Sequence, residues 1–240
     1  MRRSSITVPV YLPDWLFQLL RALKRKVITD RADTSHNGNL LGDRDIEWSW
    51  VATQMPSGPG EGLDFGPGEL SCLALIAAQR GFNMTAVDLE SVHRPYLHPR
   101  LRFIQGDILR TPLPTEHFDV VINCSTVEHV GLSGRYGVTE DHPDGDLGAM
   151  TRLRSSMKPS GTMLLTIPVG RDAVFAPLHR VYGPERLPRL LDGYIVEKQE
   201  YWLKNKLNNW VLSHKEDALT REPQARLYGI GCFVLRRPRD

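Results

Sequence analysis

The hydrophobic and polar positions of this chain change period several times, and these changes predict alternating strands and helices. Short apolar runs rich in Val, Ile, Leu and Phe are typical of buried strands, whereas apolar residues three or four apart indicate helices. We expect strands at residues 61–65, 83–88, 101–105, 118–124, 162–168, 194–202 and 226–236, and helices at 44–54, 69–80, 147–157 and 184–191. Strands separated by helices predict an α/β fold with a Rossmann-like, doubly wound, mostly parallel sheet. The last two strands are close in sequence, which suggests an antiparallel hairpin at one edge.

The residues before this alternating pattern are organised differently. An amphipathic helix is expected at 14–26, and a polar loop follows it. This helix could lie on a membrane surface, but packing on the domain or on a second subunit, as in a homodimer, is the favoured interpretation. No segment is long enough to span a bilayer. We expect two parts: N-terminal helices with a lid at 1–57, the lid being residues 31–43, and a larger domain at 58–240.

The composition is that of an ordinary soluble globular domain, with 41% hydrophobic and 24% charged residues in a chain of 240. The formal net charge of +2 is too small to indicate a nucleic-acid partner. Cys72, Cys124 and Cys232 lack the spacing of a metal or redox motif and lie in apolar runs. This pattern favours buried, reduced thiols, and so a cytoplasmic location.

The segment between the first strand and the first helix, GLDFGPGE at 62–69, has the residues of a ligand-binding turn. Gly66 and Gly68 permit a tight turn and let a ligand approach the backbone, and the start of the next helix points amide groups at that ligand. The Asp64 carboxylate can pair with a cationic or amino-bearing group near the turn. Asp88, at the end of the second strand, can accept hydrogen bonds from two ribose hydroxyls.

The sequence GDIL at 106–109, after the third strand, adds a position for a base. Asp107 could hydrogen-bond an adenine amino group while Ile108 covers the ring face. A nicotinamide dinucleotide is the rival ligand, but its G-x-G-x-x-G/A fingerprint would end at Ser71, and Glu69 would repel a pyrophosphate. The turn therefore favours a nucleoside that carries no phosphate.

Five motifs in this order resemble those of the class I S-adenosylmethionine-dependent methyltransferases, over roughly residues 60–236. They are LDFGPG, the acid Asp88, GDI, FDVVINCSTVEHV and LRSSMKPSGTMLLTIP. The resemblance implies that the domain at 58–240 is a methyltransferase domain that binds S-adenosylmethionine. It also implies a role for each cofactor-binding residue: Asp64, Gly66 and Gly68 around the methionine part, Asp88 at the ribose, and Asp107 with Ile108 at the adenine.

The segment that follows the fourth strand, EHVGLSGRYGVTEDHPDGD at 128–146, is rich in acids, histidines and glycines. Because ligands of this fold bind outside the carboxyl ends of the strands, we expect this segment to lie beside the transferable methyl group and over the acceptor. An alcohol acceptor must lose its proton, either to a base or through a metal that lowers its pKa. We take His142 as the candidate base, and Glu128 and His129 as further catalytic residues.

A second resemblance concerns a metal. Some oxygen methyltransferases carry E-x-x-E-H after the fourth strand and another histidine after the fifth, and they hold a divalent ion with these residues. Here Glu128 and His129 match the last two positions, Ser125 stands at the first, and His179 falls where the later histidine does. The resemblance implies a metal site formed by Glu128, His129 and His179, with magnesium expected, that chelates two neighbouring hydroxyls. Carboxylate and imidazole ligands also suit manganese, zinc or iron.

The pattern RYG…DHPDGD…HRVY also resembles a bacterial group of saccharide O-methyltransferases associated with methylmannose polysaccharide synthesis. This implies a small, mannoside-like saccharide acceptor. A catechol, a quinol or another small metabolite is an alternative, although within the acceptor segment only Tyr136 would offer aromatic lining. The terminal ribose of an RNA is a further possible acceptor, but the low net charge disfavours it. The chain could also be a non-catalytic cofactor-binding module, but the density of reactive side chains argues against this.

Each candidate residue also has a purely structural interpretation. Glu128 and His129 could be a pair at the end of the strand, His179 a satisfied loop histidine, and His142 a surface residue. Asp146 precedes an apolar periodic run, so we expect it to cap the following helix.

Overall fold

The computed structural model of the chain describes residues 43–68, 72–91 and 97–239. These residues belong to a unit that extends from Gly38 to Asp240. The predicted helix at 14–26 lies outside the described residues, as does the predicted lid except for its last residue. The predicted division of the chain at residue 57 therefore stays a prediction.

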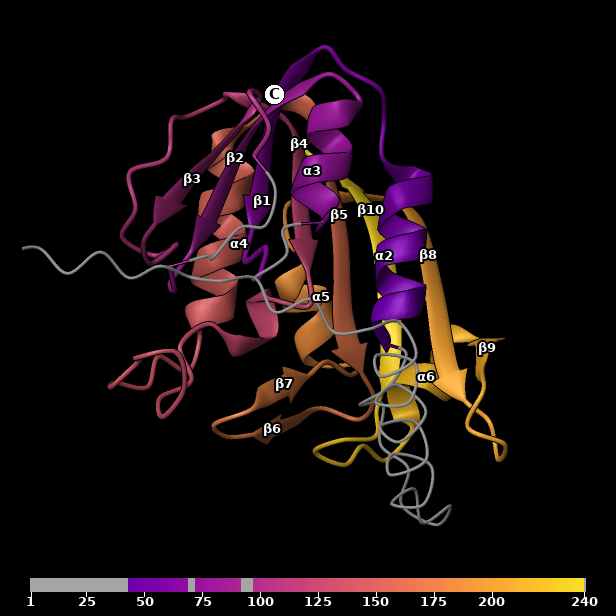
Figure 1. Cartoon of the computed structure of the whole chain (residues 1–240). Helices are drawn as coiled ribbons and strands as arrows, with labels where there is room; N and C mark the ends of the chain where they lie inside the picture. Colours follow the sequence, from indigo (N-terminus) through magenta and orange to yellow (C-terminus); the bar gives the residue numbers. More distant parts are fainter. Residues whose placement is uncertain (1–42, 69–71, 92–96, 240) are drawn as a thin grey trace, which may run out of the picture. The chain divides into compact units, whose positions relative to one another are not determined.

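Eight strands form one mixed sheet in the order β3-β2-β1-β4-β5-β10-β8-β9 (Figure 1). The strands are β1 (Gly60–Phe65), β2 (Phe82–Asp88), β3 (Leu101–Gln105), β4 (Phe118–Cys124), β5 (Met157–Val169), β8 (Ile195–Lys204), β9 (Trp210–Ser213) and β10 (Gly229–Arg236). Strands β1 to β5 pair in parallel, whereas β10 runs antiparallel to both of its neighbours. The predicted α/β class and the mostly parallel, Rossmann-like sheet are confirmed.

The antiparallel end of the sheet is more elaborate than a hairpin. Strands β8 and β10 pair antiparallel, as the sequence suggested. However, β9 and helix α6 (Lys215–Thr220) lie between them in sequence, and β9 pairs with β8 to form the edge. The sequence pattern missed both of these short elements.

Helices cover both faces of the sheet (Figure 1). They are α2 (Asp43–Gln54) and α3 (Cys72–Gln79) on one face, and α4 (Gly145–Ser156), α5 (Arg186–Leu190) and α6 on the other. Successive side chains of a strand point to opposite faces, so Val121 of β4 enters the core beneath α4 while Ile122 enters the core beneath α2. Burial on both faces explains why this strand is a continuous apolar run.

Two short strands that the sequence did not predict follow β5. They are β6 (Ala173–Phe175) and β7 (His179–Val181), which pair as a separate two-stranded sheet. Strands of three residues are too short to show a period in the sequence. Another short element, the 3-10 turn η1 (Val127–His129), continues from β4. Among the described residues, no helix combines the length and the apolar character needed to cross a membrane.

Candidate functional site

Strand β1 ends in the predicted glycine turn. Gly66 and Gly68 have φ angles of 67° and 64°, a backbone region that favours glycine. The Gly66 amide donates to the Val87 carbonyl at 2.9 Å, and the Gly68 amide donates to Asp88 Oδ2 at 3.3 Å. The turn therefore lies against the end of β2, and the structure brings Asp88 next to it.

The loop after β3 holds the predicted base-binding pair. Asp107 Oδ1 accepts the Leu109 amide at 2.9 Å, and the side chain of Ile108 is buried. Arg152 of α4 fixes this loop, because its guanidinium donates to the carbonyls of Ile108 at 2.8 Å and Thr111 at 2.6 Å. The loop is thus tied to a helix that also packs on the sheet.

One cavity of about 520 Å³ joins this loop and the glycine turn to the segment after β4. One part of its lining comprises Gly66, Gly68, Asp88, Asp107 and Ile108, which we call the cofactor wall. Another part comprises Ser125, His129, Tyr136, Glu140 and His142, which we call the acceptor wall. The volume is within the usual range for sites that bind small ligands. Two predicted sets of residues, far apart in sequence, therefore meet.

Asp64 does not line this cavity. Its side chain is 2% exposed, and its Oδ2 has no hydrogen-bond partner among the described residues. Burial raises the pKa of this carboxyl to about 7, and the nearby charge of Asp88 adds to the effect. The contact of Asp64 with a cofactor stays a prediction.

Glu128 is a second buried carboxyl, at the acceptor side. It is 2% exposed, and its Oε2 has no hydrogen-bond partner within the described ranges. Burial raises the pKa of the Glu128 carboxyl to about 8, so the protonated form predominates at neutral pH. A protonated carboxyl can donate a hydrogen bond as well as accept one.

His129 is held in one tautomer. Its Nδ1 lies 2.5 Å from the Leu178 carbonyl oxygen, which can only accept, so Nδ1 carries the hydrogen. In the neutral ring the lone pair is then on Nε2. Burial lowers the pKa of His129 to about 4, so the ring is neutral near pH 7. Because His129 lines the cavity, a neutral imidazole faces the space where an acceptor would lie.

The three predicted metal ligands lie near one another but do not form a recognisable metal site. His129 Nε2 lies 3.7 Å from Glu128 Oε1, and the ring centroids of His129 and His179 are 6.4 Å apart. His179 packs against the Tyr228 ring, and burial lowers its pKa to about 4. In the part of the chain that the structure describes, no three His, Cys, Asp or Glu side chains are placed to hold a metal ion. This arrangement gives no support to the predicted divalent ion, and the metal site stays a prediction.

Helix α2 supplies two residues that the sequence did not single out. Glu47 is 1% exposed and accepts hydrogen bonds from the hydroxyls of Ser125 and Thr166, the latter at 2.9 Å. Arg44 Nη1 donates to its other oxygen at 2.7 Å, and Arg44 lines the cavity. The available signal was an acid and a base three residues apart, which share a helix face. Trp50 of the same helix is buried in the core.

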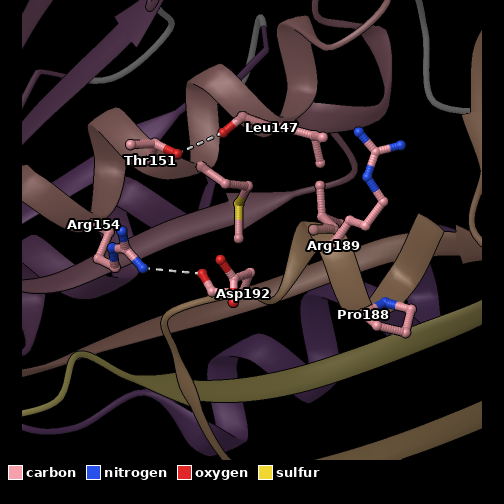
Figure 2. A pocket seen from close by; sticks show the side chains of 8 residues that line it. Leu147, Thr151, Arg154, Pro188, Arg189 and Asp192 are labelled. Atoms are coloured by element: carbon pink, nitrogen blue, oxygen red, sulfur yellow. Dashed lines mark hydrogen bonds between the residues drawn. The ribbon is translucent and has the colours of Figure 1, made fainter. Parts of the chain in front are cut away.

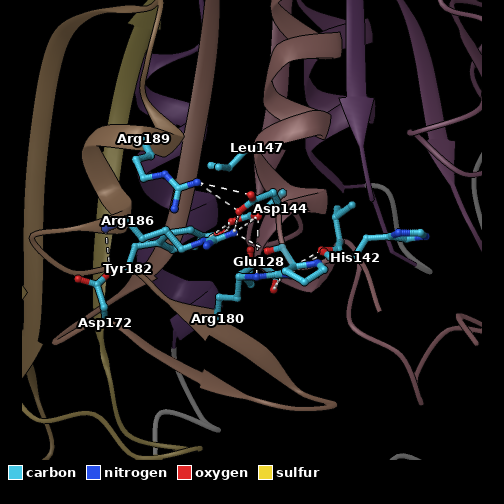
Figure 3. A network of polar contacts seen from close by, with 12 residues as sticks. Glu128, His142, Asp144, Leu147, Asp172, Arg180, Tyr182, Arg186 and Arg189 are labelled. Atoms are coloured by element: carbon cyan, nitrogen blue, oxygen red, sulfur yellow. Dashed lines mark hydrogen bonds and ion pairs between the residues drawn. The ribbon is translucent and has the colours of Figure 1, made fainter. Parts of the chain in front are cut away.

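Asp146 was expected to cap α4, and this prediction is wrong. Asp144 occupies the cap position, and Asp146 lies within the first turn with no exposed surface. Figure 3 shows the network in which it takes part. Its Oδ2 accepts the Tyr182 hydroxyl at 3.0 Å and Arg186 Nε at 2.9 Å. Partners distant in sequence, rather than the local helix end, therefore fix this carboxylate.

Solved structures with this arrangement identify the fold. The chain is 18% identical to a 1,6-didemethyltoxoflavin-N1-methyltransferase from Burkholderia thailandensis, solved with S-adenosylhomocysteine bound. That match covers 97% of this chain and 93% of the other, with a TM-score of 0.57. It is 14% identical to the N-methyltransferase NodS of Bradyrhizobium japonicum, also in complex with S-adenosylhomocysteine, over 91% and 97% of the two chains, with a TM-score of 0.52. The chain has the fold of class I S-adenosylmethionine-dependent methyltransferases.

This methyltransferase fold does not by itself give the reaction. The [4+2]-cyclase SpnF matches with 17% identity over 85% of this chain and 87% of its own, at a TM-score of 0.55. A family model described as "Caenorhabditis protein of unknown function, DUF268" matches residues 112–218, less than half of the chain. A search of curated proteins found no match. None of these findings names a saccharide, so the saccharide group stays a prediction.

Proposed function

We propose that the chain is an S-adenosylmethionine-dependent O-methyltransferase that acts on a hydroxyl of a small, uncharged saccharide. The observation that carries this proposal is the single cavity in which the cofactor wall meets the acceptor wall. S-adenosylmethionine, when bound, supplies an electrophilic methyl group. Every other requirement of the transfer falls on residues of this chain, which must hold the acceptor oxygen in line and receive its proton.

The cofactor wall supports binding of a nucleoside. An added Cβ at Gly68 would meet no described atom within 4 Å, so the turn opens onto the cavity. Asp88 and Asp107 also line the cavity and offer carboxylates, which suit ribose hydroxyls and an adenine amino group. Ile108 offers an apolar contact for the base.

The acceptor wall supports proton removal by histidine. In the proposed step the acceptor oxygen forms a bond to the methyl carbon, the bond from carbon to sulfur breaks, and sulfur keeps the electron pair. The hydroxyl proton then passes to an imidazole. His129 is the better placed base because the Leu178 carbonyl fixes its ring and leaves Nε2 as the acceptor. His142 also lines the cavity, has an exposed side chain, and is the second candidate for the base.

The lining of the cavity supports an uncharged acceptor. Its carboxylates outnumber its guanidinium groups: Asp88, Glu90, Asp107 and Glu140 against Arg44 and Arg110. A polyanion such as RNA would be repelled by this lining, whereas a neutral polyol can hydrogen-bond to both kinds of group. Phe65 and Tyr136 are the only Phe, Tyr or Trp side chains in the described lining, which is few for a catechol or quinol.

Metal assistance belongs to this proposal as a separate hypothesis. The resemblance to metal-dependent oxygen methyltransferases supports it, whereas the described residues contain no group of three His, Cys, Asp or Glu placed to hold a metal ion. A base-only mechanism and a metal-assisted one differ in a simple way: only the second needs a divalent ion for turnover.

The test measures release of S-adenosylhomocysteine by the full chain against short mannosides, other sugars, catechols and RNA ends. Each acceptor is assayed with magnesium and with EDTA. We expect turnover of a sugar by the wild type, and loss of both turnover and cofactor binding in Asp88→Ala. Turnover of a catechol or an RNA alone would overturn the saccharide assignment. Failure of the wild type to bind S-adenosylhomocysteine in calorimetry would overturn the methyltransferase assignment itself. Loss of turnover in EDTA would favour the metal.

A further inference from the structure

The loop of the acceptor wall closes on itself. The His142 amide donates to the Gly131 carbonyl at 2.9 Å, and the Ser133 amide donates to Asp141 Oδ1 at 2.8 Å. Gly131 has a φ of 77°, and a Cβ at this position would lie 2.4 Å from the His142 carbonyl oxygen. The two ends of the loop at 131–142 therefore touch, as in a compact Ω-loop.

One buried arginine reaches both ends of this loop. Arg180 of β7 is 1% exposed. Its Nη1 donates to the carbonyls of Val130 at 2.6 Å and Glu128 at 3.4 Å, and its Nη2 donates to those of His142 and Pro143, both at 3.2 Å. Figure 3 shows Arg180 within this network of polar contacts. A single side chain thus fixes the backbone beside the candidate residues Glu128, His129 and His142.

The charge of this arginine is balanced within the same network. Asp146 Oδ1 lies 3.8 Å from Arg180 Nε and is also bound by Arg186. A buried guanidinium needs a counter-charge and acceptors for its hydrogens, and the four carbonyls supply those acceptors. The planar guanidinium carries several donors and can therefore reach carbonyls on two sides at once. A lysine ammonium is a compact point charge and cannot do so.

We propose that Arg180 is a positioning residue for the acceptor wall, which it holds in the geometry that methyl transfer requires. The proposal rests on the proposed function for its catalytic consequence, but not for its structural one. It acts through the backbone on either side of the loop and does not itself line the cavity. The hairpin of β6 and β7 adds a second hold on the same wall through the Leu178 carbonyl and His129.

A second arginine provides a matched comparison. Arg152 makes the same kind of contact, from one guanidinium to two carbonyls, but to the loop at Ile108 and Thr111 in the cofactor wall. If each arginine organises the wall it touches, substitutions of the two should separate the two binding steps. Arg154 serves as a control residue outside both walls. It donates to the Asp192 carbonyl at 3.1 Å in the groove between α4 and α5 (Figure 2).

The experiment compares Arg180→Lys, Arg152→Lys and Arg154→Lys in the full chain. Hydrogen exchange of the amides in 131–142 reports on the loop, and calorimetry with S-adenosylhomocysteine reports on the cofactor wall. For Arg180→Lys we expect the loop amides to exchange at least tenfold faster, since a lysine cannot replace all four hydrogen bonds of the guanidinium, while cofactor affinity stays unchanged. For Arg152→Lys we expect weaker cofactor binding with loop exchange unchanged. For Arg154→Lys we expect no change in loop exchange or in cofactor affinity.

The kinetic arm uses whichever acceptor the wild type turns over. Arg180→Lys should lower kcat by about tenfold or more while the KM for the cofactor stays constant, because misplacement of reacting groups costs rate. Unchanged loop exchange would overturn the proposal, as would equal losses of loop protection and cofactor affinity, which indicate general unfolding. If Arg180→Lys does not fold, Arg180→Gln keeps two donors and is scored by the same readouts. If no acceptor is found, the exchange and calorimetry still decide the structural role.

Discussion

The buried carboxyl of Glu128 leads to a prediction that needs no knowledge of the acceptor. The perturbation is Glu128→Gln, which keeps the shape of the side chain and removes its titration. The pKa of Glu128 is about 8 in the folded chain, against 4.5 for an ordinary glutamate. Between these two pH values the folded state therefore holds one proton on this group that the unfolded state lacks. Unfolding releases that proton, so the stability of the wild type falls as pH rises through this window.

The magnitude follows from proton linkage. Each pH unit within the window lowers the contribution of this group by about 1.4 kcal/mol. From pH 5 to pH 7 the free energy of unfolding of the wild type should therefore drop by about 3 kcal/mol relative to Glu128→Gln. The contribution is fully present below pH 4.5 and is lost as pH rises through the folded pKa.

The assay is urea unfolding of both proteins at pH 5, 6, 7 and 8, with the difference in free energy plotted against pH. The difference is needed because Asp64, with its pKa raised to about 7, titrates in the same window. Glu216→Gln, at an exposed position in the first turn of α6, supplies the background slope for loss of a carboxyl that water covers. A difference between wild type and Glu128→Gln that stays constant over this range would refute the reasoning, because it would mean that Glu128 is ionised in both states.

Three further predictions concern the glycine turn, Asp146 and His129. Gly66→Ala places a Cβ 2.1 Å from Thr126 Cγ2 and should lower the melting temperature. The Cβ of Gly68→Ala meets open space, so this variant should fold with a backbone strain of about 1–2 kcal/mol. It should bind S-adenosylhomocysteine more weakly than the wild type in calorimetry. Asp146→Asn removes the carboxylate beside a buried guanidinium and should cost about 3–5 kcal/mol in urea unfolding; a cost under about 1 kcal/mol would contradict the network. If His129 is the base, its pKa of about 4 predicts a transfer rate that is flat from pH 8 to pH 5 and falls towards pH 4, whereas a midpoint near 6.5, the ordinary value for histidine, would exclude it.

The sequence predicted the long elements well because their signals are local. The strands expected at 101–105 and 118–124 coincide with β3 and β4. The three-residue strands β6 and β7 gave no such signal, since their pairing depends on where β5 leads the chain. Because these strands were not predicted, the contact of the Leu178 carbonyl with His129, which fixes the tautomer of that ring, could not be predicted either.

The cofactor wall was predictable because topology alone assembles it. Residues that end parallel strands meet at one edge of the sheet, so Asp88 and the glycine turn need no side-chain detail to be placed together. Glu47 and Arg180 could not be found in this way. Glu47 contacts Thr166, 119 positions away, and Arg180 contacts Val130, 50 positions away. For Asp146 the local pattern indicated a helix cap, but an ion pair with Arg186 was the stronger interaction.

We expect the acceptor wall to determine the chemistry of this protein. Proteins that share the fold include N-methyltransferases and a cyclase, so the fold alone does not distinguish these reactions. In this chain the acceptor wall is the loop at 131–142 with its flanking residues, held by the hairpin of β6 and β7 and by Arg180. The matching family model spans 112–218 and so contains this whole assembly but not the glycine turn. On the proposed function, the segment that matches this family model is the part that would position the acceptor, so an acceptor found for a protein of that family becomes a candidate to test for this chain.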